Sequence, residues 1–136
     1  MDDAVRELVF GWLTKAMHDL ASARILGSGN DPVLDTAIYH CHQAAEKALK
    51  GFLLCHGEPF GKTHDLEVLA TLAARIDAGY SRWQEVAIAL TPYATQYRYP
   101  GVADPDIAEF TRAFDHATAF CEFVFSRLPD IKLNSG

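Results

Sequence analysis

The chain has 136 residues and a formal net charge of −6, with 49% hydrophobic and 22% charged side chains. This length fits one domain with a sizeable core, and no apolar run reaches the roughly 18 residues that a membrane span needs. The acidic balance argues against a broad grip on nucleic acid, which requires massed Lys and Arg. Three scattered cysteines favour reduced thiols in the cytoplasm over a disulfide framework, and the opening "MDDAVRELVF" does not resemble a secretory signal.

Residues 3–26 form the first predicted helix, because apolar residues recur there at intervals of three and four. This stripe consists of Val5, Leu8, Val9, Trp12, Ala16, Leu20 and Ala23. The segment "GSGNDP" then stops the helix through its glycines. Asn30 or Asp31 is expected to cap a second helix that continues to about Cys55, and Pro32 suits its first turn.

Three further helices are expected in the second half of the chain. A short one covers residues 64–76, "HDLEVLATLAARI", with its leucines on one side. Another covers about 81–97 and is expected to bend near Pro92. After the irregular link "RYPGVADP", Asp104 should cap a final helix over residues 105–128.

No segment alternates with period two for long enough to suggest a sheet. The sequence therefore predicts an all-α fold, an antiparallel up-and-down bundle of four to five helices. A single domain is expected over residues 1–136, with its core at about 3–128 and a flexible C-terminal tail over 129–136.

Histidines and cysteines gather in residues 40–57, "HCHQAAEKALKGFLLCHG", and raise the question of a metal site. Structural zinc requires four converging ligands, usually in close pairs. Cys41 and Cys55 fall near the apolar side of the helix, where a thiol packs as a small hydrophobe. His40 and His42 lie about 200° apart around the helix axis. Buried thiols and surface histidines are therefore expected, with no metal site and no other cofactor.

The polar side of the same helix carries a row of side chains that could contact a ligand. An arc of about 100° holds Tyr39, Gln43, Glu46, Lys47 and Lys50. One interpretation is a solvated face with i,i+4 pairing, as between Glu46 and Lys50. The other is a binding site, because a lysine must be solvated, paired or in contact with an anion.

The segments "WLTKAMHDLASA", "YHCHQAAEKALKGFLLCHG", "KTHDLEVL" and "YATQYRYP" occur in an order and at separations that resemble the HEPN domain family (higher eukaryotes and prokaryotes nucleotide-binding). The resemblance covers about residues 9–128, and its most specific elements are residues 43–50, 64–66 and 98–100. It implies an all-α up-and-down bundle of four long helices plus shorter ones, which agrees with the helix pattern.

Some members of this family are metal-independent ribonucleases with an Arg-x4–6-His motif, often toxins paired with a minimal nucleotidyltransferase antitoxin. Others lack the motif and are associated with nucleotide binding or with nucleotidyltransferase partners. No arginine here has a histidine at the eligible spacing, and the nearest pair, Arg112 and His116, is one residue too close. We therefore expect the purified protein to leave RNA intact.

The resemblance implies that the polar row binds a nucleotide of the ATP or GTP class. Phosphate would be attracted by Lys47, Lys50 and Arg98, hydrogen bonds would come from Gln43 and His64, and a stacking surface from Tyr39 or Tyr97, while Glu46 holds Lys50. For His64 and Arg98 a purely structural role is an alternative to ligand binding. Thr63 could cap the third helix with His64 in its first turn, and Arg98 could simply cover the bundle end with its aliphatic stem.

The expected setting is a two-component, toxin–antitoxin-like system with a small nucleotidyltransferase, by analogy with the family. Two other functions stay open. One is a ribonuclease with a non-standard arrangement around His64 or around Arg112 and His116, although RNA is not the favoured ligand. The other is a purely structural helical module.

A homodimer is also expected, because the first helix is apolar over a wide arc. Phe10, Leu13 and Met17 form a second row beside the main stripe, and Phe123 lies outside the stripe of the last helix. A small monomer rarely exposes such a patch, and symmetric pairing is the commonest way to cover it. The alternative is that a short helix or the tail covers these residues within one chain.

Overall fold

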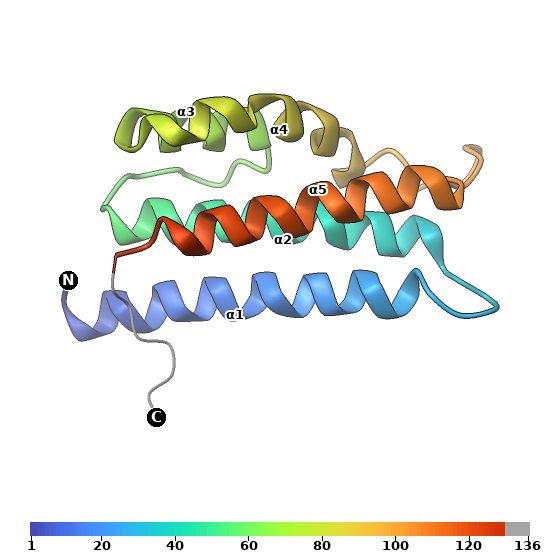
Figure 1. The fold of residues 1–136 in the computed structure, drawn as a ribbon, viewed down its shortest axis with the longest axis horizontal. Coiled ribbons are helices and arrows are strands. Elements are labelled where there is room, and N and C mark those ends of the chain that lie inside the picture. Colours follow the sequence, from blue (N-terminus) through green and yellow to red (C-terminus); the bar gives the residue numbers. More distant parts are fainter. Residues whose placement is uncertain (130–136) are drawn as a thin grey trace.

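The computed structural model describes residues 1–129 and is built from helices (Figure 1). In chain order they are α1 (Asp3–Leu26), α2 (Leu34–Cys55), α3 (Leu66–Ile76), the 3-10 helix η1 (Ala78–Trp83), α4 (Gln84–Leu90), the 3-10 helix η2 (Thr91–Ala94) and α5 (Ile107–Ser126). No strand occurs in the described part of the chain, which confirms the all-α class. None of its helices is long and apolar enough to cross a bilayer. The predicted flexible tail falls, from residue 130 on, outside the described residues.

Helix α2 lies at the centre of the molecule, with α1 on one side, α5 beside it, and α3 and α4 as a further layer (Figure 1). Its central place follows from its small side chains, since Ala37, Ala44 and Ala48 are fully buried. A Cβ added at Gly51 would lie 3.0 Å from a methyl carbon of Leu13. Small residues thus let α1 approach α2 closely.

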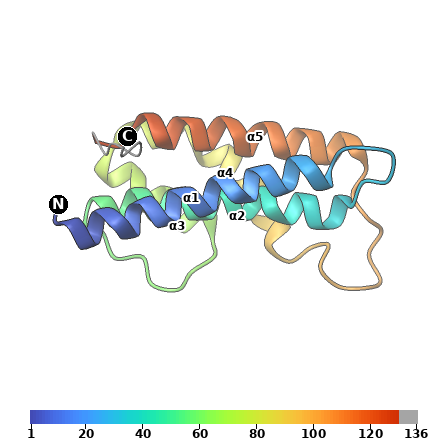
Figure 2. The same ribbon diagram turned by 90° about the horizontal axis from the view of Figure 1, so that it is seen from below.

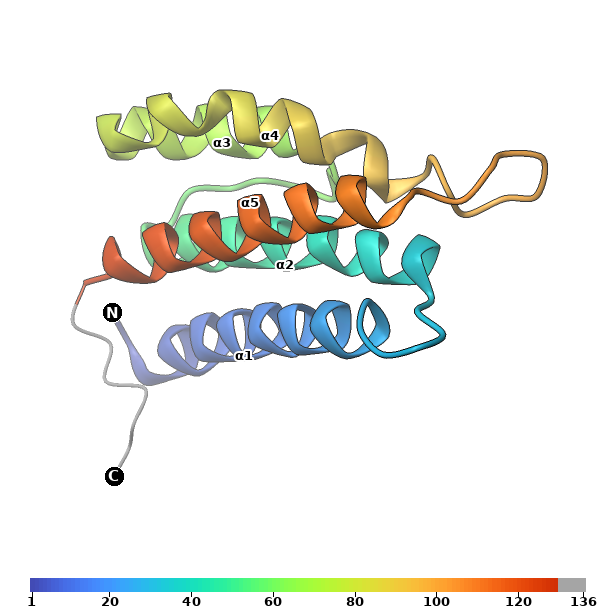
Figure 3. The same ribbon diagram turned by 45° about the vertical axis from the view of Figure 1, so that its right-hand side comes forward.

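Two loops project from the bundle on the edge away from α5 (Figure 2). One is the segment 56–65 between α2 and α3, and the other is the link 95–106 between η2 and α5. Figure 3 shows the link reaching out beyond the N-terminal end of α2. Both loops therefore belong to one side of the molecule.

The start of α2 differs from the prediction. Neither Asn30 nor Asp31 caps it, because the N-cap is Val33, which offers no side-chain hydrogen bond. Asp35 in the first turn instead accepts a hydrogen bond of 2.8 Å from the backbone N–H of Thr36. Its carboxylate lies in the first turn, where the helix dipole favours negative charge.

Helices α3 and α5 also start later than expected, because other aspartates cap them. Asp65 accepts hydrogen bonds from two backbone N–H groups of α3, so Thr63 is not the cap. Asp106 caps α5 in the same way, and the predicted cap Asp104 lies outside the helix. Each correct cap is the aspartate nearest to the first helical turn.

The predicted helix over 81–97 is broken into three short pieces, η1, α4 and η2. Pro92 lies within η2, where it lacks an N–H to continue the helical ladder. The backbone N–H groups of Thr95 and Gln96 both bond to the Pro92 carbonyl and end the segment. Tyr97 and Arg98 consequently sit in the link rather than in a helix.

The predicted dimer row is only half exposed. Leu13 is 1% exposed and Phe123 is 8% exposed, so both are covered within their own chain. Phe123 packs edge-on against Tyr80, with ring centroids 4.9 Å apart. Leu13 and Phe123 therefore cannot contribute to a dimer patch, whereas Phe10 and Met17 remain exposed.

Burial of Cys41 is confirmed, that of Cys55 is only partial, and one histidine differs from the prediction. Cys41 and Cys121 are buried, and burial raises the pKa of each thiol to about 12. Cys55 is half-buried. His42, expected on the surface, is completely buried because it lies on the side of α2 that faces the segment 56–65.

Candidate functional site

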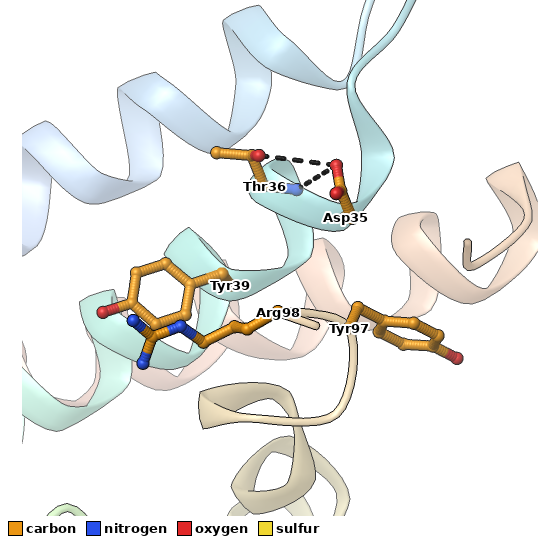
Figure 4. A pocket seen from close by; sticks show the side chains of 5 residues that line it. All are labelled: Asp35, Thr36, Tyr39, Tyr97 and Arg98. Carbon is orange, nitrogen blue, oxygen red and sulfur yellow. Dashed lines mark hydrogen bonds between the residues drawn. The ribbon is translucent and has the colours of Figure 1, made fainter. Parts of the chain in front are cut away.

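A hollow at the N-terminal end of α2 brings Arg98 onto this helix (Figure 4). Its volume is about 240 Å³, and it is lined by Asp35, Thr36, Tyr39, Tyr97 and Arg98. The Arg98 guanidinium lies over the ring of Tyr39, with its central carbon 5.1 Å from the ring centroid. The link therefore contacts α2 through a cation–π contact.

Within residues 1–129 the guanidinium of Arg98 forms no ion pair with a carboxylate. The hollow's own carboxylate, Asp35, is engaged by the backbone of Thr36 at 2.8 Å. Arg98 therefore presents a planar cation, backed by an aromatic ring, whose N–H groups are available to an anion.

The link is held in place by a clamp on α5. Glu109 accepts hydrogen bonds from the hydroxyls of Tyr93 (2.7 Å) and Tyr97 (2.9 Å and 3.0 Å). The two tyrosine rings stack with centroids 6.0 Å apart. Burial, and then the bond to Glu109, raises the pKa of both phenols, so they remain protonated donors. Tyr97 is therefore turned toward α5, away from the Arg98 guanidinium (Figure 4).

A second group of polar residues lies further along α2 and is centred on Glu46. This carboxylate is 3% exposed and lies 3.1 Å from the ammonium of Lys50 and 3.1 Å from Nδ1 of His64. The Lys50 ammonium also lies 5.7 Å and 5.5 Å from the ring centroids of Trp12 and Phe60. Since Lys50 is only 5% exposed, it serves Glu46 and is not an open phosphate donor.

The buried His42 joins this group to the loop. Its Nε2 lies 3.2 Å from the backbone carbonyl of His64, and its Nδ1 lies 2.9 Å from the side-chain amide of Gln43. Burial lowers the pKa of His42, so the ring is neutral near pH 7. Sequence reasoning missed His42, although its i,i+4 spacing from Glu46 placed both on one side of the helix.

Lys47 belongs to a third polar group, which is separate from the groups around Arg98 and Glu46. Its ammonium bonds at 2.7 Å to the buried carboxylate of Asp19 on α1, and Nδ1 of His40 lies 2.7 Å from the other oxygen. Neither Asp19 nor His40 was predicted to matter. Neither residue belongs to a recognisable sequence motif, and their pairing depends on how α1 packs against α2.

The predicted row is thus one face of α2 but not one pocket. Tyr39 with Arg98 and Glu46 with His64 are separated by seven residues, or about 10 Å of helix rise. Gln43 lies between them, and Lys50 is one further turn away. Within residues 1–129, no three His, Cys, Asp or Glu side chains are grouped as for a metal ion.

Solved structures resemble the whole fold. The crystal structure of TT1696 from Thermus thermophilus is 32% identical in sequence, covers 88% of this chain and 98% of its own, and has a TM-score of 0.73. ST0689, described as an archaeal HEPN homologue, is 24% identical over 89% of this chain and 98% of its own, with a TM-score of 0.69. No curated protein matches the chain.

The sequence profile of the HEPN domain matches residues 10–128, which includes every residue of the polar face of α2 and of the link that contacts it. The match agrees with the all-α fold and with the resemblance inferred from the sequence segments. The chain therefore belongs to the HEPN domain family.

Proposed function

We propose that this protein binds a nucleotide along the polar face of α2, with Arg98 as the phosphate ligand. The observation that carries the proposal is the Arg98 guanidinium, backed by Tyr39 in a hollow and unpaired with any carboxylate of residues 1–129. Arginine binds phosphate oxygens through two parallel N–H donors, and a guanidinium held in one orientation favours anions that match this geometry.

The size of the hollow supports a phosphate group rather than a whole ligand. Its volume of about 240 Å³ is below the range of roughly 300–1,000 Å³ that is usual for small-molecule pockets. The remainder of a nucleotide would extend along α2 toward Gln43 and His64. The sequence predicts that Lys47 and Lys50 also bind phosphate, but their ammonium groups are paired with Asp19 and Glu46.

The binding site can be located by nuclear magnetic resonance. ATP or GTP added to the labelled protein should shift the amide signals of residues 35–43 and 95–98, and leave those of the exposed half of α5 unchanged. Shifts confined to other segments, or none at millimolar nucleotide, would contradict the proposal.

We further propose that the protein works with a small nucleotidyltransferase in a two-component system. Membership of the HEPN family supports this pairing by analogy. If a nucleotidyltransferase is encoded beside this chain, the two should copurify when they are expressed together. Separate elution at micromolar concentrations would count against the pairing.

Two alternatives give different results in simple assays. A ribonuclease would cleave single-stranded RNA without metal, and His64→Ala or His116→Ala would abolish the cleavage. A purely structural module would show no change in melting temperature with any nucleotide. Arg112 and His116 are both exposed on α5 and lie one helical turn apart.

A further inference from the structure

His64 is an exposed residue that is held from beneath by buried side chains. Its side chain is 70% exposed, yet Nδ1 lies 3.1 Å from both oxygens of the buried Glu46 carboxylate. Its backbone carbonyl is bonded to the buried His42. The next residue, Asp65, caps α3 and so anchors the loop from the other side. A surface imidazole fixed at backbone and ring is preorganised in the way that binding residues are.

The partners of the ring determine which nitrogen carries the proton. The buried Lys50 ammonium lies 3.1 Å from Glu46 and requires a negative partner, so Glu46 is a carboxylate and can only accept. Nδ1 of His64 must therefore be the N–H donor. In the neutral ring Nε2 is then unprotonated, and it has no hydrogen-bond partner among residues 1–129.

The same reasoning applies to His42 and fixes the backbone of the loop. The His64 carbonyl can only accept, so Nε2 of His42 donates to it. The structure places Oε1 of Gln43 2.9 Å from Nδ1 of His42. Because Nδ1 of the neutral ring can only accept, the Gln43 amide must be turned by half a rotation so that its nitrogen donates. Gln43 and His42 thus form a chain of hydrogen bonds that ends on His64.

We propose that Nε2 of His64 is a fixed hydrogen-bond acceptor that selects nucleotides whose base carries an exocyclic amino group. Glu46 and His42 are the positioning residues that hold it. This inference rests on the proposed function, because Arg98 would hold the phosphate of the same ligand.

The spacing of the two anchors fits such a ligand. Arg98 lies at the level of Tyr39 and His64 at the level of Glu46, about 10 Å apart along one face of α2. The loops that carry them lie on the same edge of the bundle (Figure 2). A nucleoside monophosphate extends over a comparable length from its phosphate to the far edge of its base, and Gln43 would lie beneath its ribose.

The proposal predicts a preference within a matched pair of ligands. AMP should bind about three- to ten-fold more tightly than purine riboside 5′-monophosphate, because the second ligand lacks the exocyclic amino group. His64→Ala should remove the preference. The double variant Glu46→Gln/Lys50→Met, which leaves no buried charge unpaired, should weaken it by freeing the ring to change tautomer. His18→Ala, at an exposed histidine of α1, is the matched control and should behave as the parent.

The tautomer is measurable without any ligand. The imidazole nitrogen shifts of labelled protein at pH 8 should show His64 with its proton on Nδ1. A proton on Nε2, or an equal preference for AMP in His64→Ala, would overturn the inference. If the parent binds AMP and purine riboside monophosphate equally, base selection fails while phosphate binding at Arg98 stands. If the parent binds neither ligand, the proposed function itself fails.

Discussion

Glu46 is the residue on which the polar interior of this protein depends. One buried carboxylate pairs with Lys50 and with His64, and it also lies 3.9 Å from Nδ1 of His42. Removal of water from two ions is costly, so each ion is stable only while the other remains. One interpretation of the sequence places Glu46 and Lys50 on a solvated face, but in the structure they form a buried ion pair.

Lys50→Met should therefore lower the free energy of unfolding by about 3–5 kcal/mol, because Glu46 would be left as a buried and poorly compensated carboxylate. Urea denaturation at pH 7 measures the change. The double variant Glu46→Gln/Lys50→Met should recover most of the loss, since it buries no charge. Lys62→Ala, at an exposed lysine of the neighbouring loop, should change stability little. A similar small effect for Lys50→Met would contradict the buried pair.

His42 should make the fold sensitive to mild acid. Burial lowers its pKa in the folded state below the ordinary value of 6.5, so below pH 6.5 the unfolded chain binds more protons than the folded chain. This residue's contribution is complete above pH 6.5 and is lost as the pH falls from there toward the folded pKa. The urea midpoint should therefore decrease between pH 7 and pH 5, and His42→Gln should flatten that decrease. His18→Ala, at an exposed histidine of α1, should retain the parent's slope.

At the scale of elements, the link 95–106 is ordered by a clamp rather than by a helix. Glu109 holds Tyr93 and Tyr97, and the Arg98 amide bonds to the Thr95 carbonyl at 3.2 Å. If Arg98 binds an anion as proposed, the clamp lowers the conformational entropy that binding would cost, because the link is already ordered.

Glu109→Ala should increase hydrogen exchange at the Arg98 amide and weaken nucleotide binding several-fold, because it leaves both tyrosine hydroxyls without their acceptor. Glu109→Gln should retain part of the protection, since its amide oxygen still accepts. Glu85→Ala, at an exposed glutamate of α4, is the control. Unchanged exchange at Arg98 in Glu109→Ala would show that other contacts order the link.

The elements that sequence could predict are those whose signals are local. Periodic apolar residues placed α1 correctly from Asp3 to Leu26, and a proline marked the break near residue 92. The starts of α3 and α5 were displaced because Thr63 and Asp104 each compete with a neighbouring aspartate. Which aspartate reaches the free N–H groups depends on how the loop enters the helix, and local sequence does not determine that path.

At the scale of the whole molecule, an apolar groove lies between α1 and α5. A groove of about 400 Å³ is lined there by Met17, Phe114 and Phe125, among others, and Phe10 lies two turns before Met17. Arg24 and Glu122 line the same groove and carry opposite charges. Phe114 and Phe125 line this groove, whereas Leu13 and Phe123 of the predicted row are buried.

We expect a homodimer through this groove. Light scattering at micromolar concentration should report twice the mass of the chain, and Met17→Glu should shift the mass toward the monomer because it puts a charge into an apolar contact. Leu8→Glu, at an exposed residue on the opposite side of α1, is the matched control and should stay dimeric. A monomeric parent would remove this prediction.

The sequence predicted which residues share the polar face of α2 better than it predicted which of them contact one another. The helical arc correctly placed Tyr39, Gln43, Glu46 and Lys50 on one face, because helix geometry is regular. It could not show that Lys47 reaches Asp19 on α1, or that His64 returns over Glu46, since both contacts join distant segments. Whether a lysine is open or buried depends on its neighbours in space.

Titration calorimetry with ATP and GTP tests the central claim, which is that Arg98 binds phosphate on α2. The parent should bind with an affinity that decreases as salt increases, and Arg98→Ala should bind roughly ten- to a hundred-fold more weakly without unfolding. Arg98→Lys should retain part of the affinity, and Arg6→Ala, at an exposed arginine of α1, should bind as the parent does. Equal binding by Arg98→Ala and the parent, or no binding by the parent, would contradict the account.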